Sequence, residues 1–168
     1  MAKNIELSRR RFLQISGVGV GCLVTNVTPA SQQIGSTTLP YSPISIALAS
    51  QLKDNVPATF NFPDHSSPCI LIKFGQKVPS GVGPQQDIVA FSNLCTHMGC
   101  PLTYEQKTRV FKCSCHFTMF DAEMGGQMTC GQATEKLPQI ILEYNSNDDS
   151  IKAIAVKGLI YGRQANVL

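Results

Sequence analysis

The amino-acid sequence predicts an all-β fold, because its composition and its apolar runs both favour short strands. It contains 13 glycines and 10 prolines in 168 residues, and these residue types form turns more readily than they extend helices. The apolar runs are brief and rich in β-branched residues, and helix signals are sparse. A hydrophobic content of 43% is enough for one packed core. We therefore expect one domain with a terminal appendage.

Residues 1–30 have the layout of an export signal. A basic stretch at 8–14 precedes a weakly apolar, glycine-rich run at 15–27, and Ala30 offers a small residue for cleavage. The arginine pair followed by Phe-Leu resembles a twin-arginine signal, which exports proteins that are already folded. A short core helix is the alternative, but the three glycines of the run disfavour it. The apolar run of about 13 residues is shorter than the ~20 that span a bilayer, so we expect a periplasmic protein that is membrane-associated only if the signal is retained.

The net charge of +3 comes from this N-terminal segment. Ten Lys or Arg and ten Asp or Glu residues remain after residue 30, so the body of the chain is neutral. Because no basic stripe is present in the sequence, we expect no nucleic-acid partner.

After a polar lead-in at 31–43, the chain is predicted to form short strands. Asn145 to Asp149 is rich in turn residues and fits a hairpin, and Pro79 to Pro84 is expected to be an exposed loop. The predicted strands are Ile44 to Ala47, Ile70 to Phe74, Ile88 to Ser92, Arg109 to Lys112, Gln139 to Tyr144, Ile151 to Val156 and Leu159 to Tyr161.

Between Cys95 and Pro138 the pattern changes. Five of the seven cysteines and two of the three histidines lie there, among glycines and few aliphatic residues. A stretch with so few apolar residues needs cross-links or a metal to become ordered.

Two short cysteine and histidine clusters carry the candidate metal chemistry: Cys95-Thr96-His97-Met98-Gly99-Cys100 and Cys113-Ser114-Cys115-His116. Two thiolates and two imidazoles suit either zinc or an iron–sulfur centre. Zinc sites usually space their ligands as C-x₂₋₄-C or H-x₃₋₅-H, whereas one residue separates the first cysteine and histidine here. A cluster of two irons can take one thiolate and one imidazole from each of two loops, which fits the pairing. Two disulfides with bystander histidines are a further alternative, but they leave the mirrored histidines unexplained.

The two clusters resemble the Rieske signature, C-x-H-x-G-C with C-x-C-H. The resemblance implies one [2Fe-2S] cluster, with Cys95 and Cys113 on one iron and His97 and His116 on the other. It also implies a disulfide between Cys100 and Cys115. The implied fold is a Rieske-like antiparallel β sandwich or barrel over residues 44–168, with an inserted cluster-binding subdomain at about 92–137.

The same resemblance marks two positions that tune the reduction potential. In the related proteins of cytochrome bc complexes, a Ser two residues after the second histidine and a Tyr four residues after it donate hydrogen bonds to the cluster or its ligands. Thr118 and Phe120 occupy these places here. Because Phe cannot donate, we expect a lower potential than quinol-oxidising relatives need. A loop that reads Gly-Pro-Ala-Pro in those relatives is Gly-Gln-Ala-Thr at 131–134.

Together with the export signal and the length, these features look most like the small Rieske subunit of arsenite oxidase. The resemblance implies a large molybdopterin and iron–sulfur catalytic subunit as partner and a soluble cytochrome or copper protein as electron acceptor. The chain alone would then transfer electrons without catalysing bond chemistry.

Three alternatives remain at the level of sequence. They are the Rieske subunit of a quinol-oxidising cytochrome bc complex, a zinc- or disulfide-stabilised module without redox function, and a ring-hydroxylating dioxygenase ferredoxin. Ferredoxins of that last kind lack the two clamp cysteines and an export signal. Of the remaining residues, His65 is expected to be an ordinary loop residue and Cys69 a buried thiol, while no role is predicted for Cys130.

Overall fold

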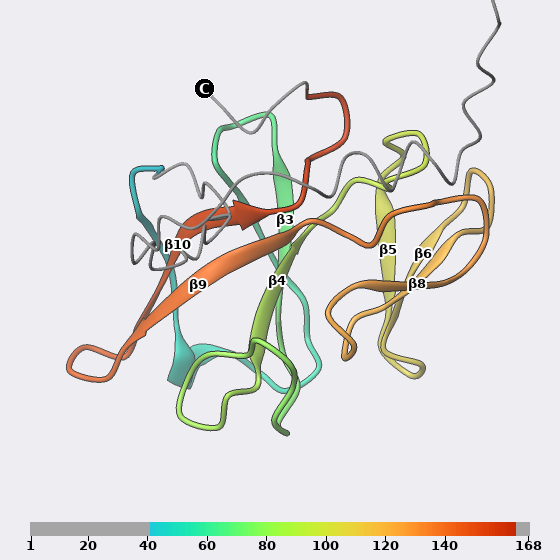
Figure 1. Ribbon diagram of the computed structural model, residues 1–168. Helices are drawn as coiled ribbons and strands as arrows, with labels where there is room; N and C mark the ends of the chain where they lie inside the picture. Colours follow the sequence, from blue (N-terminus) through green and yellow to red (C-terminus); the bar gives the residue numbers. More distant parts are fainter. Residues whose placement is uncertain (1–40, 164–168) are drawn as a thin grey trace, which may run out of the picture. The chain divides into compact units, whose positions relative to one another are not determined.

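The computed structural model describes residues 41–163, and the predicted export signal and most of the lead-in lie outside the described residues. Nearly all regular structure in that part of the chain is β-strand, which confirms the predicted fold class (Figure 1). One short 3₁₀ helix, η1 (Ala49–Gln51), is the exception. No helix among residues 41–163 combines the length and apolar character needed to cross a membrane.

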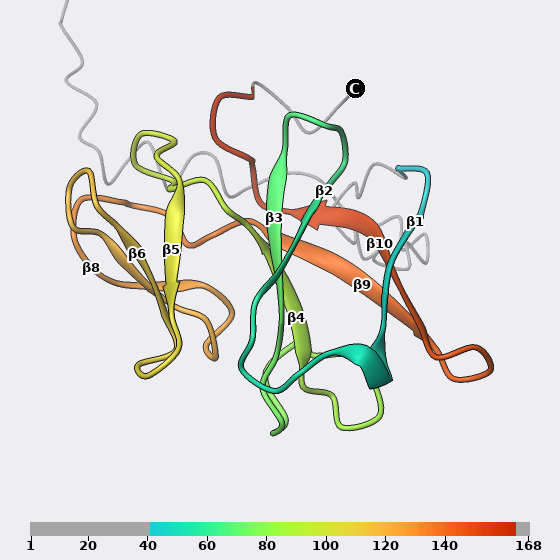
Figure 2. The same cartoon turned by 180° about the vertical axis from the view of Figure 1, so that it is seen from behind.

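Two antiparallel sheets make up the fold, as the views from opposite sides show (Figures 1 and 2). The large sheet has the strand order β1-β10-β9-β4-β3-β2, and the small sheet has the order β5-β6-β7-β8. The strands of the large sheet are β1 (Ile44–Leu48), β2 (Ala58–Asn61), β3 (Pro68–Lys73), β4 (Ile88–Ser92), β9 (Gln139–Asn145) and β10 (Ser150–Lys157). Those of the small sheet are β5 (Leu102–Glu105), β6 (Val110–Cys113), β7 (Met119–Asp121) and β8 (Gln127–Cys130).

The small sheet is an insertion between two neighbouring strands of the large one. β4 and β9 pair directly, with Ala90 opposite Ile140 and Phe91 opposite Gln139. All four strands of the small sheet come from the chain between β4 and β9. The predicted insertion is thus present.

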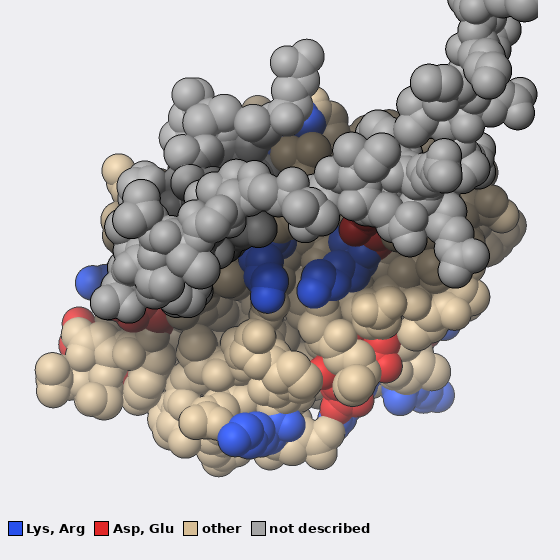
Figure 3. All heavy atoms as spheres, in the orientation of Figure 1, with Lys and Arg blue, Asp and Glu red and all other residues tan. Residues whose placement is uncertain are grey.

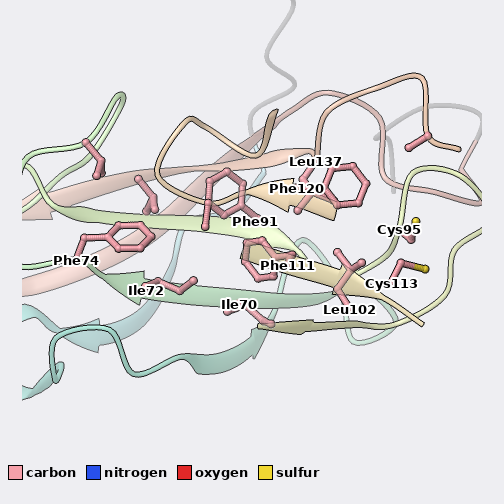
Figure 4. Packing of buried hydrophobic residues seen from close by; sticks show 14 residues of the cluster. Ile70, Ile72, Phe74, Phe91, Cys95, Leu102, Phe111, Cys113, Phe120 and Leu137 are labelled. Carbon is pink, nitrogen blue, oxygen red and sulfur yellow. The ribbon is translucent and has the colours of Figure 1, made fainter. Parts of the chain in front are cut away.

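Alternating side chains of β3 and β4 supply two hydrophobic clusters. Ile70 and Phe91 belong to the first cluster, while Leu71 and Ala90 belong to the second. Both faces of these strands are therefore buried, which explains why their sequences are almost continuously apolar. The first cluster joins the two sheets through Phe91, Phe111, Phe120 and Leu137, and it reaches Cys95 and Cys113 at one end (Figure 4).

The predicted strand at 159–161 is wrong. β10 ends at Lys157, and Gly158 follows with a φ of +96°, beside Pro138. A turn then forms in which Arg163 donates its amide hydrogen to the carbonyl of Ile160 at 3.2 Å. Ile160 is buried, whereas Leu159 and Tyr161 are exposed. In this apolar run, Ile160 alone is packed in the core, and the run does not pair as a strand.

On the uncovered part of the face in Figure 3, basic and acidic side chains are interspersed among uncharged residues. That face does not present a broad area of one charge.

Candidate metal centre

Two loops of the small sheet carry the predicted ligands. The first follows β4 and is closed by hydrogen bonds from the Cys95 amide to the Cys100 carbonyl at 2.9 Å and from the Gly99 amide to the Cys95 carbonyl at 2.8 Å. The second connects β6 to β7 and is closed by a 2.9 Å hydrogen bond from the Cys113 amide to the Thr118 carbonyl. Each loop therefore holds its ligands with its own backbone.

Gly99 lets the first loop turn tightly against the segment that follows β10. Its φ is +71°, and a Cβ atom there would lie 2.3 Å from a ring carbon of Tyr161. Both the conformation and the space require glycine at this position. The Tyr161 ring consequently packs directly on the loop.

A disulfide between Cys100 and Cys115 joins the two loops, as the resemblance implied. The sulfur atoms of both residues lie within 4.8 Å of the Cys113 sulfur. Three cysteines in so small a space resemble a metal site, but the two in the disulfide are not available as thiolate ligands. Cys113 alone of the three is free to bind a metal.

The four predicted ligands form two layers that differ in burial. Cys95 and Cys113 are free thiols, 1% and 3% exposed, and they lie near each other at the end of the core (Figure 4). The rings of His97 and His116 lie farther out, 4.6 Å apart between centroids and close to perpendicular. His116 is exposed and His97 is partly buried.

The chemistry of these donors fits the expected cluster. The Nδ1 atom of His97 is buried and has no hydrogen-bond partner, so a ligand role would satisfy it. Burial raises the pKa of the Cys95 thiol, and the His97 backbone amide opposes that shift. A metal that replaces the thiol proton would remove the cost of a buried free thiolate. Two inner sulfurs and two outer imidazoles match the division of ligands between the two irons of a Rieske centre.

Comparison with known proteins decides the family. A sequence profile of the Rieske [2Fe-2S] domain matches residues 42–141. The chain belongs to the Rieske [2Fe-2S] family. Its cofactor is therefore one [2Fe-2S] cluster, and the zinc and disulfide alternatives no longer stand.

Relatives of two kinds resemble this Rieske protein to different extents. The iodate reductase subunit IdrB of Denitromonas iodatirespirans is 40% identical over 163 residues, covering 95% of this chain and 86% of that protein. The cytochrome bc1 complex Rieske iron-sulfur subunit of Streptomyces lividans is 43% identical over 61 residues, covering 36% of each chain. The likeness to the first kind thus extends over nearly the whole chain, and the likeness to the second is local.

The fold also matches solved Rieske structures. The soluble domain of Rieske protein II (soxF) from Sulfolobus acidocaldarius superimposes with a TM-score of 0.66 at 23% identity, over 76% of this chain and 84% of that one. This match supports the Rieske fold.

Thr118 and Phe120, the two expected tuning residues, are both fully buried. Phe120 belongs to the same hydrophobic cluster as Cys95 and Cys113. The Thr118 hydroxyl oxygen accepts a hydrogen bond from the Gln132 amide at 3.0 Å. Sequence reasoning missed this contact, because a main-chain amide has no signature in the residue type.

Neither the remaining cysteines nor His65 is one of the predicted ligands. Cys69 is a buried thiol, as predicted; it donates to the carbonyls of Phe62 and Ser67 at 3.4 Å, and burial raises its pKa to about 12. Such a thiol is unreactive. Cys130 is an exposed thiol on β8, and His65 lies in an exposed turn.

Sequence reasoning also missed two exposed apolar residues next to the histidines. Met98 follows His97 and is 56% exposed, while Phe117 follows His116 and is 77% exposed. Phe117 has a φ of +57°, which is uncommon for a residue other than glycine. Each of these two apolar side chains directly follows a predicted outer ligand in the sequence.

Proposed function

We propose that this protein is the electron-transfer subunit of a periplasmic molybdenum oxidoreductase that acts on a small oxyanion. The observation that carries the proposal is the layered site, with thiols inside and imidazoles outside. The [2Fe-2S] cluster supplies one-electron chemistry when it is bound. The chain itself then needs to perform no bond chemistry.

Each residue of the site has a distinct part in this function. Cys95 and Cys113 would hold the cluster from the core side, where burial excludes water. His97 and His116 would bind the outer iron, and the exposed His116 ring would give the shortest path to a partner. Met98 and Phe117 would exclude water at the partner contact.

The nature of the partner is supported by the extent of the sequence likeness. The relatives named iodate reductase subunit match this chain over 86% and 82% of their own lengths. The resemblance to the arsenite oxidase small subunit implies a large molybdopterin subunit. Arsenite oxidation would deliver electrons to this chain, which would pass them to a soluble cytochrome or copper protein. Iodate reduction would withdraw electrons from it.

The same experiment tests the partner and the direction of electron flow. The exported protein is purified together with its bound partner, and the partner is assayed for molybdenum. Arsenite is then added to the oxidised complex, and iodate is added to the reduced complex, while the cluster is followed by electron paramagnetic resonance. Reduction by arsenite supports an arsenite oxidase, and reoxidation by iodate supports an iodate reductase.

A quinol provides the discriminating control. Reduction of the cluster by a quinol, with no molybdenum in the complex and no response to either oxyanion, would replace this proposal with the cytochrome bc alternative. The isolated chain should turn over neither oxyanion, because the partner would hold the molybdenum site.

A further inference from the structure

The segment that follows β8 approaches the second ligand loop unusually closely. Gly131 has a φ of +106°, and a Cβ atom there would lie 2.3 Å from the Thr118 Cα atom and 2.7 Å from its Oγ1 atom. Only glycine allows this approach. The approach places the next main-chain amide, that of Gln132, 3.0 Å from Thr118 Oγ1.

Thr118 connects this amide to the cluster ligands. Its side chain is fully buried, and its carbonyl accepts the amide hydrogen of Cys113 at 2.9 Å. A hydroxyl group has one hydrogen to donate and two lone pairs that accept. The Gln132 amide occupies one lone pair, so the hydroxyl hydrogen must point away from Gln132. The hydroxyl hydrogen is thus left to donate to another acceptor, and Cys113, whose amide bonds the Thr118 carbonyl, carries a predicted ligand sulfur in the same loop.

We propose that the main-chain amide of Gln132 is a positioning group that raises the reduction potential of the cluster by acting through the Thr118 hydroxyl. Hydrogen bonds in a chain polarise one another, so the amide makes the hydroxyl a stronger donor. Reduction places negative charge on the cluster and its sulfurs, and a stronger donor stabilises that charge. The amide also prevents the hydroxyl from rotating away. This inference concerns the cluster and holds whichever partner supplies the electrons.

Two substitutions at the same position separate the amide from the side chain. Gln132→Pro removes the N–H group, while Gln132→Ala keeps it and removes only an exposed side chain. We expect a lower reduction potential in the proline variant and no shift in the alanine variant, as measured by voltammetry on the cluster-loaded protein. A proline variant with the wild-type potential would overturn the proposal.

A double-mutant cycle tests whether the amide acts through Thr118. Thr118→Val removes the hydroxyl group with little change of shape. In that background, Gln132→Pro should cause no further shift of the potential. An equal shift with and without the hydroxyl would show that the amide acts by another route, and the inference would be wrong.

Two further measurements keep the test decisive if the proline ring prevents cluster uptake. An amide-to-ester replacement at residue 132 removes the same N–H group without the ring, and the same outcomes apply to it. Hydrogen exchange followed by mass spectrometry should show faster exchange at Gln132 in Thr118→Val than in the wild type. Unchanged exchange would mean that the hydrogen bond does not form in solution.

Discussion

The rings of His97 and His116 meet at nearly right angles, with 4.6 Å between their centroids, although one belongs to the loop before β5 and the other to the loop after β6. The disulfide between the neighbouring Cys100 and Cys115 holds these loops together. The geometry of the outer ligands is therefore set by both loops at once.

We expect His97→Ser and His116→Ser each to abolish the paramagnetic signal of the reduced Rieske cluster, because serine provides no ring nitrogen. His65→Ser is the matched control, since His65 lies in an exposed turn apart from the two loops. Electron paramagnetic resonance of the reduced proteins checks the prediction. An unchanged signal in either ligand variant would mean that the ligands are assigned wrongly.

Replacing both Cys100 and Cys115 with alanine should lower the free energy of unfolding by about 3 kcal/mol, from the chain entropy of the loop that the disulfide closes. Denaturant titration of the wild type and the variant measures the difference. Cys130→Ser should leave stability unchanged, because Cys130 is exposed and unpaired in the described part of the chain. Alkylation that finds both Cys100 and Cys115 reduced in the mature protein would contradict this prediction.

Phe120→Tyr should raise the reduction potential by adding one hydroxyl donor near the cysteine ligands, and Thr118→Ala should lower it by removing one. Both positions are fully buried, so these groups act without competition from water. Phe60→Tyr is the control, because Phe60 packs against the other hydrophobic cluster. We expect the wild type to lie below the upper end of the Rieske range of about −150 to +300 mV. A lower potential in Phe120→Tyr, with the cluster intact, would show that the ring does not point at a ligand sulfur.

Met98→Ser and Phe117→Ser should weaken binding of the electron-transfer partner, by roughly tenfold for a loss of about 1.4 kcal/mol, without changing the potential. Both side chains are exposed beside an outer ligand. Met124→Ser is the control, because this exposed methionine lies in the turn between β7 and β8, at the end away from the ligand loops. Equal electron-transfer rates in all three variants at limiting partner concentration would place the contact surface elsewhere.

Replacing Arg9 and Arg10 together with lysine should retain the protein in the cytoplasm, because these two arginines, followed by one residue and then by Phe12-Leu13, form the pair that the twin-arginine route would read. Arg11→Lys is the control outside that pair. Fractionation of cells followed by immunoblotting measures the distribution. Normal export of the double variant would exclude the twin-arginine route.

The sequence predicted six of the strands, because their apolar runs are buried in the large sheet or in the core that joins the sheets. It missed β2, β5, β7 and β8, because each of them has only three or four residues, and β8 is also mostly exposed. The strand predicted at 159–161 was wrong because only Ile160 of this apolar run is buried.

The ligand set could be predicted because each loop keeps its cysteine and histidine within a few residues of each other. The contact between Gln132 and Thr118 was not readable, since it depends on how closely one loop passes the next. The exposure of Met98 and Phe117 could not be predicted either, because an apolar residue in a sequence is first expected to be in the core.

The direct pairing of β4 with β9 has a consequence for how such proteins diversify. Because β4 and β9 pair with each other, residues 93–138 form a cassette, an insert whose two ends lie next to each other in the large sheet. A cassette from another member of the family could be grafted between these strands, provided that the side chains against Phe91 and Leu137 are retained. The cassette would then determine both the reduction potential and the choice of partner, while the large sheet stays the same.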